Sequence, residues 1–293
     1  MLKFGSSVDR ALSMLAYCTC RGFVKKILLS VFRFILIGYF FILLTFMFFE
    51  NYLVYPAPQY PAGDWEASWL DPLDVSFESE DGTRLHGWLV EHPDPSGYLL
   101  FCHGNGTHIA FSASEIAELR DRLGVTVFAF DYRGYGRSEG KPNEPGVLAD
   151  GQAAFDWLKK QAGVGSDEII VMGSSLGGGV AVDLAARNAP RVLILDRTFS
   201  SLPDVAARHY PWLPVRWLMK NRMASIEKIS DYHGPVFLFH GRADRVVPFD
   251  LGKALFEASP SGKKEFTESA SCGHNDPLPP EAWERLLDFL RAV

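Results

Sequence analysis

The chain of 293 residues carries a formal net charge of −6 at pH 7, and its composition is that of a globular protein except for one apolar stretch near the N-terminus. This length accommodates one large α/β domain or two small ones. The first fifty residues have a net charge of +4, which leaves −10 for the rest, and an acidic domain without a basic stripe is not typical of a nucleic-acid-binding protein.

The apolar stretch covers residues 27–49, and Arg33 is its only charged residue. About 20 apolar residues suffice to cross a bilayer core of roughly 30 Å, and Arg33 is close enough to one end to extend its guanidinium to the interface. We therefore predict a transmembrane signal anchor at residues 27–49. Residues 1–26 form a basic segment before it, which suits a membrane surface with anionic lipids.

The charges around this anchor predict its orientation. Five Lys or Arg residues lie upstream of it, and Glu50 follows it directly. By the positive-inside rule, the N-terminus then lies in the cytoplasm and the rest of the chain on the extracytoplasmic side, periplasmic or lumenal. Two other interpretations fit less well, because a cleaved signal peptide has a shorter apolar core and a small-residue cleavage site, and a core helix has a polar face.

The four cysteines give little information. Cys18 and Cys20 lie before the anchor, where acylation and an inert role are both open. Cys102 and Cys272 are not spaced as a metal site and would pair only if the fold brought them together. We expect neither a metal nor another cofactor.

A proline-rich connector follows the anchor, and we predict that residues 50–72 are a linker to a globular domain at residues 73–293. Two segments that alternate apolar and polar residues flank the turn at Gly82 and predict an antiparallel hairpin. From residue 97 on, short apolar runs alternate with helical patterns, which indicates an α/β protein with a mostly parallel sheet of about eight strands and helices on both faces. The expected strands are 75–78, 85–90, 98–102, 126–130, 169–172, 192–195, 236–240 and 265–267, and the expected helices are 110–123, 146–161, 176–188, 251–258 and 281–291.

Residues 198–234, here called the cap segment, break this alternation. The segment is too long for an ordinary connection, and it holds too many large apolar side chains, among them Tyr210, Trp212 and Trp217, to be disordered. We predict a small helical cap over the carboxyl edge of the sheet.

The sequence Gly173-Ser174-Ser175-Leu176-Gly177 lies between an expected strand and an expected helix. A turn this sharp forces its central residue into strained dihedral angles, and the flanking glycines let backbone pass where a Cβ would collide. The strain exposes the hydroxyl beside a helix N-terminus, which favours developing negative charge. This pattern predicts that Ser175 is a nucleophile.

A serine hydroxyl needs a general base, and the base needs an acid that orients it. In the strand–turn–helix context of this motif, the expected chain order is Ser, acid, His, with each residue on a loop at the end of a strand. Asp244 follows the strand 236–240, and His274 follows the strand 265–267. We predict His274 as general base and then general acid, and Asp244 as the residue that orients it.

Several residues compete for these roles. A second Gly-x-Ser-x-Gly pattern centres on Ser138, but it runs into Lys141-Pro142 without a helix and is interpreted as a turn. Asp196 also follows a strand and stays open as an alternative acid, whereas Asp276 is too near His274 in sequence to reach round the ring. We expect the other histidines at strand ends, His103 and His240, to bond local backbone.

The negatively charged oxygen of an acyl-transfer intermediate needs two hydrogen-bond donors. The first expected donor is the backbone amide of Leu176, the residue after the predicted nucleophile. The second is the backbone amide of Asn105, in the loop after the strand 98–102, where glycines let the chain turn towards the pocket.

These motifs together resemble the α/β-hydrolase superfamily. The resemblance rests on residues 101–106, 131–138, 173–177, 240–244 and 273–275. It covers the chain from about residue 75 to the C-terminus and is greatest to the membrane-anchored branch that includes protein depalmitoylases and lysophospholipid or monoacylglycerol lipases. It implies the α/β-hydrolase fold and implies that Asp131 and Arg133 brace the loop beside the nucleophile. The superfamily hosts many reactions, so the substrate is not implied.

The sequence thus favours a serine hydrolase that cleaves ester or thioester bonds through an acyl-enzyme. The anchor and the aromatic cap segment favour a substrate with an acyl chain, drawn from a membrane or near it. A serine peptidase is an alternative. It would need an acidic or polar pocket for a peptide N-terminus, and Asp204, Glu227 and Asp231 of the cap segment leave this open. A non-catalytic membrane-tethered binding module on this fold is a third hypothesis, and it predicts that one of the three catalytic residues is missing, whereas all three are present.

Overall fold

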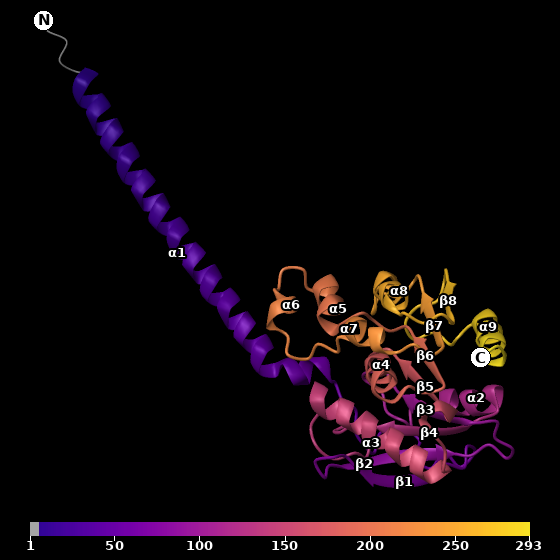
Figure 1. Ribbon diagram of the computed structural model, residues 1–293. Helices are drawn as coiled ribbons and strands as arrows, with labels where there is room; N and C mark the ends of the chain where they lie inside the picture. The colour runs from indigo at the N-terminus through magenta and orange to yellow at the C-terminus, as the bar shows by residue number, and fades with distance from the viewer. Residues whose placement is uncertain (1–5) are drawn as a thin grey trace, which may run out of the picture. The chain divides into compact units, whose positions relative to one another are not determined.

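The computed structural model describes residues 6–293, with side chains from residue 25 onward, and the chain divides into two units at Glu50 (Figure 1). Helix α1 (Ser6–Val54) makes up the first unit and ends in the second. Its apolar side chains from Ile27 to Phe49 are mostly exposed, and Lys25–Val54 is the one helical stretch in the described residues with the length and composition of a membrane span. Cys18 and Cys20 lie outside the residues whose side chains are described.

The second unit contains an eight-stranded sheet in the order β1-β2-β4-β3-β5-β6-β7-β8. Strand β2 pairs antiparallel with β1 and with β4, and all the other pairs are parallel. The predicted hairpin and the mostly parallel sheet are therefore confirmed. The strands are β1 (Leu73–Glu78), β2 (Arg84–Val90), β3 (Tyr98–Cys102), β4 (Thr126–Asp131), β5 (Ile169–Ser174), β6 (Val192–Asp196), β7 (Val236–Gly241) and β8 (Lys264–Ser269).

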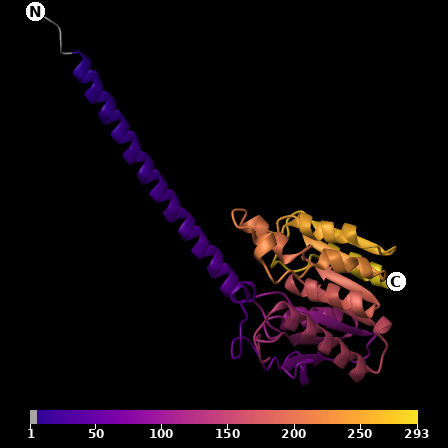
Figure 2. The same ribbon diagram turned by 60° about the vertical axis from the view of Figure 1, so that its left-hand side comes forward.

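Helices cover both faces of the sheet, as expected (Figures 1 and 2). The buried side chains of α2 (Ala113–Leu123) and α9 (Pro280–Arg291) belong to one apolar core. Those of α3 (Glu144–Ala162), α4 (Leu176–Asn188) and α8 (Phe249–Ala258) belong to a second core on the other face. Strand side chains alternate between the two cores, so the central strands β3, β5, β6 and β7 are apolar on both faces.

The ends of these helices depend on capping contacts. The Asn143 side chain accepts a hydrogen bond from Gly146 N at 3.0 Å, and α3 therefore begins two residues before its apolar periodicity does. Gly163 ends the same helix with φ +69°, a left-handed conformation that glycine adopts without a Cβ clash. Capping sets the true boundaries a few residues away from the predicted ones.

The prediction of a linker at residues 50–72 needs correction. Residues 51–72 belong to the same compact unit as residues 73–293, and Tyr55, Trp65 and Leu70 are buried in it. The Trp65 ring packs edge-on against Trp88 of β2 at 6.0 Å between centroids. The segment lacks strand or helix periodicity because its aromatic side chains insert singly into the core.

The cap segment is helical, as predicted, in three short helices and one 3-10 turn. It comprises α5 (Leu202–His209), α6 (Val215–Leu218), α7 (Ser225–Lys228) and η2 (Ile229–Asp231). Helix α7 and η2 pack against α4, where Met223 lies against Gly179. Trp212 and Trp217, by contrast, are exposed.

The strand order places a topological switch at β3. The chain passes from β3 to β4 on one side and then to β5 on the other side of β3. Ligands of open α/β sheets bind in the crevice at the carboxyl ends of the strands at such a switch. The loops after β3 and β5 border this crevice.

Candidate active site

Ser175 lies at the turn between β5 and α4 with φ +51° and ψ −114°, as its strand–turn–helix context predicts. Its backbone N–H donates to Asp196 O at 2.9 Å, and its carbonyl accepts from the Thr198 hydroxyl at 2.8 Å. A Cβ on Gly173 would collide with the carbonyl of Gly177, so the turn requires glycine there. These contacts hold the residue in a conformation that a non-glycine residue rarely adopts.

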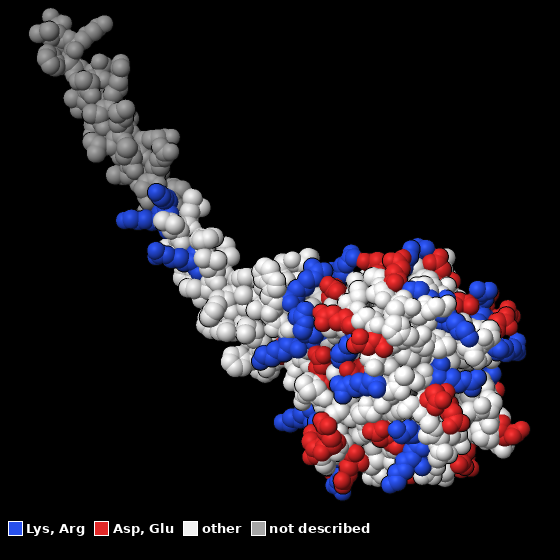
Figure 3. Space-filling view, viewed as in Figure 1, with Lys and Arg blue, Asp and Glu red and all other residues white. Residues whose placement is uncertain are grey.

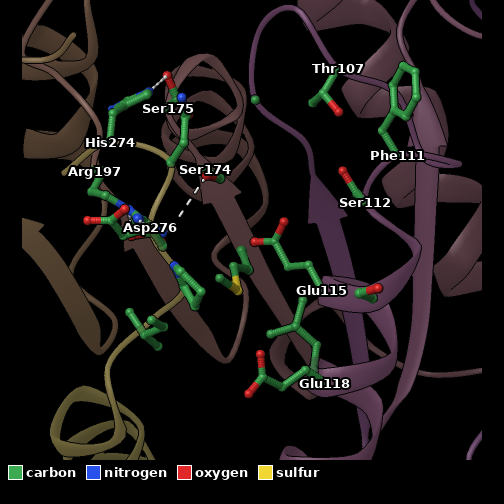
Figure 4. Close-up of a pocket in the computed structure, with 18 of the residues that line it drawn as sticks. Thr107, Phe111, Ser112, Glu115, Glu118, Ser174, Ser175, Arg197, His274 and Asp276 are labelled. Atoms are coloured by element: carbon green, nitrogen blue, oxygen red, sulfur yellow. Dashed lines mark hydrogen bonds and ion pairs between the residues drawn. The ribbon is translucent and has the colours of Figure 1, made fainter. Parts of the chain in front are cut away.

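The structure brings His274 to this serine (Figure 4), and Asp244 to His274. His274 Nε2 lies 3.0 Å from Ser175 Oγ, and His274 Nδ1 lies 2.7 Å from Asp244 Oδ2. Because a carboxylate accepts but does not donate, Nδ1 carries the ring proton and Nε2 is left to accept the serine proton. This is the geometry that activates a serine hydroxyl.

The Asp244 carboxyl is buried and hydrogen-bonded on both oxygens. Oδ1 accepts from Val246 N at 2.9 Å and from Val247 N at 2.8 Å. Burial alone would favour the neutral acid, but hydrogen bonds from His240, His274 and the Val247 backbone outweigh it, so the pKa of Asp244 lies well below its usual range. The carboxylate is therefore ionised at neutral pH and able to orient His274.

The alternative acid, Asp196, has another partner. Its two carboxylate oxygens accept from the Arg197 guanidinium at 2.7 and 2.8 Å. Arg197 also donates to the backbone carbonyls of Gly273 and Asp276, which flank His274 in sequence. The Asp196–Arg197 pair thus holds the loop that carries His274, while the His274 ring contacts Asp244.

The loop after β3 lies against Ser175. A Cβ on Gly104 would be 3.6 Å from the Cβ of Ser175, so the backbone of this loop is in van der Waals range of the predicted nucleophile. The Leu176 N–H is the first of α4 and has no intrahelical acceptor. The Asn105 N–H lies outside any helix or strand, and within the described structure it donates to no other group. Within the described structure neither predicted donor is hydrogen-bonded to another group.

The Asn105 side chain fixes this loop by three hydrogen bonds. Its Nδ2 donates to Val54 O at 2.6 Å, at the end of α1. Its Oδ1 accepts from the Tyr135 hydroxyl at 2.6 Å and from Gly106 N at 3.1 Å. The loop that carries the Asn105 backbone amide is thus tied to two separate parts of the chain, at Val54 and at Tyr135.

A cavity of about 620 Å³ opens beside Ser175 and His274. Its opposite wall carries Thr107, Phe111, Ser112, Glu115 and Glu118, from the end of the β3 loop and from α2 (Figure 4). None of the cap segment lines this cavity. The cap segment instead packs against α4, where Thr198 lies against Gly178 and Met223 against Gly179.

Known proteins share this sequence and fold. A family model described as alpha/beta hydrolase fold matches residues 97–218. Alpha/beta hydrolase domain-containing protein 17C of Xenopus laevis is 34% identical over 232 residues, which cover 78% of this chain and 73% of that protein. The chain belongs to the α/β-hydrolase family.

Two further comparisons agree with this assignment. An uncharacterised protein of Mycobacterium tuberculosis is 41% identical to this α/β-hydrolase over 206 residues, 70% of this chain and 73% of that one. The solved esterase Pf2001 of Pyrococcus furiosus superposes with a TM-score of 0.65 over 80% of this chain and 98% of its own, at 22% identity. The latter likeness shows a shared fold.

The remaining candidates of the sequence have structural partners in the α/β-hydrolase. Ser138 is buried and donates to Asp131 O at 2.6 Å, as suits a turn. His103 Nδ1 lies 2.7 Å from Gly104 O, and His240 Nε2 lies 3.0 Å from Val247 O, which agrees with the expected backbone contacts. Cys102 and Cys272 are both free thiols.

The two residues that the resemblance assigned to bracing have different neighbours. Asp131 accepts from Ile109 N at 2.9 Å and so braces the loop after β3. Arg133 instead joins α3 to the hairpin, through Asp150 at 2.8 Å and Asp81 at 2.8 Å. Only Asp131 contacts the loop beside Ser175.

Two polar residues of the site escaped the sequence analysis. Arg197 follows Asp196 at the end of β6, and a charged pair at that strand end was the available signal. Glu115 lies on α2, where a polar side chain is normally solvated and no sequence signal marks it. Burial and the nearby Asp196 carboxylate raise the pKa of Glu115 to about 7.

We expect Asn105→Ala to lower kcat by about 10², because the loop then loses its side-chain anchors and its backbone donor is misplaced. KM should change little, since the Asn105 side chain bonds to Val54 and Tyr135 within the protein. Steady-state hydrolysis of p-nitrophenyl acetate measures both constants, and circular dichroism checks the fold. Tyr135→Phe removes one of the three contacts and should give a smaller loss. An Asn105→Ala enzyme with unchanged kcat would contradict the role of this loop.

Proposed function

We propose that this chain is a serine hydrolase that cleaves carboxylic ester or thioester bonds through an acyl-enzyme intermediate. The observation that carries the proposal is the continuous contact from Ser175 Oγ through the His274 ring to Asp244, at 3.0 and 2.7 Å. A hydroxyl, an imidazole and an ionised carboxylate in this arrangement support nucleophilic acyl transfer.

The reaction follows from this arrangement. Ser175 Oγ attacks the substrate carbonyl while its proton passes to His274 Nε2, and the carbonyl oxygen becomes negative. The backbone N–H groups of Asn105 and Leu176 donate to that oxygen. His274 then returns the proton to the leaving oxygen or sulfur, which gives the acyl-serine and a free alcohol or thiol. Water, deprotonated by His274, releases the acid and restores Ser175.

We infer that residues 27–49 are an uncleaved membrane anchor with residues 1–26 on the cytoplasmic side. The exposed apolar side chains of α1 and the basic residues before them support this inference. The catalytic unit then lies on the extracytoplasmic side. A phosphatase reporter fused after Val293 should be active and a cytoplasm-dependent fluorescent reporter dark, and the opposite pattern would reverse this topology.

The preferred substrates on this proposal are acyl esters or thioesters at or near a membrane. The anchor would hold the catalytic unit at a lipid surface, and the cap segment exposes the large aromatic side chains Tyr210, Trp212 and Trp217. Neither nucleic acid nor a cofactor has a part in the reaction as proposed.

A fluorophosphonate probe tests the serine chemistry directly. The wild-type protein should label on a single residue, and Ser175→Ala should abolish the label, while Ser138→Ala should retain it. The Ser138 variant is the matched control because it lies in the second Gly-x-Ser-x-Gly pattern of the same chain. Labelling that persists in Ser175→Ala would overturn the proposal, and a protein that never labels would favour the non-catalytic binding module.

The acyl-chain preference has its own measurement. In detergent, kcat/KM for p-nitrophenyl esters should rise with acyl chain length, because each buried methylene contributes about 0.8 kcal/mol of transfer free energy. A strict preference for acetate would exclude acyl-chain substrates without affecting the serine mechanism.

One observation favours a second candidate, a hydrolase for substrates with a cationic group such as an aminoacyl ester or a peptide N-terminus. Glu115 and Glu118 face Ser175 across the cavity (Figure 4). The Arg197 guanidinium is the cation of the opposite wall, and it is paired with Asp196. A carboxylate that faces the reacting carbonyl would attract a substrate ammonium.

Two matched esters separate the candidates: p-nitrophenyl esters whose acyl chains end in trimethylammonium or in tert-butyl. If the second candidate is right, the cationic ester is preferred by about tenfold in kcat/KM, which corresponds to about 1.4 kcal/mol. Because an acid ionises above its pKa, this ratio should rise with pH through about 7, the pKa of Glu115. The titration of the general base, His274, affects kcat/KM for both esters equally and therefore cancels in their ratio. Glu115→Gln should flatten it, and a ratio near one at every pH would leave the acyl-chain candidate alone.

A further inference from the structure

We propose that residues 210–222 form a docking surface that rests on the lipid headgroups beside the end of the anchor. The inference builds on the proposed anchor at residues 27–49 and adds a second contact between the catalytic unit and the membrane. It is carried by the exposure, the location and the charge of these residues.

The large aromatic side chains of the docking surface are exposed. Trp217 is 89% exposed, more than any other large apolar side chain in the described residues, and Trp212 and Tyr210 are 54% and 45% exposed. Three such side chains within eight residues expose apolar area that a soluble surface rarely presents together. Trp and Tyr are enriched at the membrane interface, where the ring is apolar and the N–H or O–H reaches water.

The docking surface is joined to the residues that directly follow the proposed anchor. Asn221 Nδ2 donates to Asn51 Oδ1 at 2.8 Å, and Asn221 Oδ1 accepts from the Tyr55 hydroxyl at 3.1 Å. The end of the docking surface is therefore bonded to the chain that directly follows the anchor. Four residues span at most about 14 Å, so Trp217 lies within that reach of Asn221. A polar interfacial layer about 5–8 Å thick borders the bilayer core, which brings this surface to the headgroups.

The sequence of the docking surface is basic. The sequence from Val205 to Ile226 contains no Asp or Glu but three arginines and one lysine, within a domain that is otherwise acidic. Figure 3 shows Lys and Arg side chains over the region of α5 and α6, with Asp and Glu side chains among them. Arg208 and Arg216 pair with Asp250 and Asp204, and Lys220 and Arg222 add further positive charge to the sequence of the surface. Basic groups among exposed aromatic side chains match an anionic lipid surface.

The occupant is therefore a bilayer with anionic headgroups. A second copy of the chain is the main competing occupant, but two like basic surfaces would repel each other. Lipid also needs no shape complementarity, which suits a surface of short helices and turns.

The test uses the full-length protein in vesicles of phosphatidylcholine and phosphatidylglycerol, with brominated acyl chains as fluorescence quenchers. The chain has seven tryptophans, so the contribution of one is the difference between wild type and its Phe variant. We expect Trp217→Phe to remove a large part of the quenched emission. The control is Trp69→Phe, since Trp69 is 58% exposed and its neighbour Leu70 contacts Arg120 of α2. That variant should leave the quenched fraction unchanged.

Three outcomes decide the proposal. Quenching confined to Trp217 supports it, with a smaller effect in vesicles that lack phosphatidylglycerol. Equal quenching of both tryptophans, or of neither, in protein that resists carbonate extraction overturns the docking surface but leaves the anchor and the hydrolase intact. Protein that carbonate releases would overturn the anchor and the docking surface together. Cross-linking of a Trp217→Cys variant into dimers without quenching of Trp217 would assign the surface to a second copy.

The docking surface also predicts a selective kinetic effect. Trp217→Ala should raise KM for a long-chain ester presented in vesicles and leave kcat/KM for soluble p-nitrophenyl acetate unchanged, because Trp217 does not line the cavity. An equal loss on both substrates would point to a folding defect in place of lost membrane contact.

Discussion

The strained backbone of Ser175 is the constraint on which the rest of the site depends. Its φ of +51° is held by two hydrogen bonds, from its N–H to Asp196 O and to its carbonyl from the Thr198 hydroxyl. Both partners come from the end of β6, so the neighbouring strand and not the turn alone fixes the conformation. Gly177 has the same dependence, since a Cβ there would collide with the carbonyl of Cys102 at the end of β3. The turn therefore requires β3, β5 and β6 to be in register.

The strand order of the sheet brings the other residues of the site to Ser175. Parallel strands end at one edge, and the order β3-β5-β6-β7-β8 brings five consecutive strand ends to the same side. Asn105, Ser175 and Arg197 follow three of these ends, and Asp244 and His274 follow the other two. Each residue is far from the others in sequence, but the 2.7 and 3.0 Å contacts need only small loops once the strands are paired. The chemistry is thus a consequence of strand order.

Features of the fold and the site that leave a local signal in the sequence could be predicted, and those that depend on contacts between distant residues could not. Hydrophobic periodicity gave every strand of the sheet, and the strand–turn–helix context selected Ser175 over Ser138, because both signals are local. The choice between Asp196 and Asp244 was not local. Both follow strands, and their partners separate their roles, since Asp244 contacts the His274 ring and Asp196 pairs with Arg197. Residues 51–72 were misassigned for the related reason that single buried aromatic side chains leave no periodic signal.

The short segment after the anchor has the widest structural influence. Val54 accepts from the Asn105 side chain, which positions the loop beside Ser175, and Asn51 accepts from Asn221 at the end of the cap segment. The two accepting residues, Val54 and Asn51, are three positions apart in the sequence. The same short segment therefore contacts both the loop that would hold the oxyanion and the surface that would meet the lipid. A flexible tether could make neither bond, because its backbone would sample many conformations. If the anchor spans the bilayer, the segment that leaves the membrane is therefore also a structural part of the site.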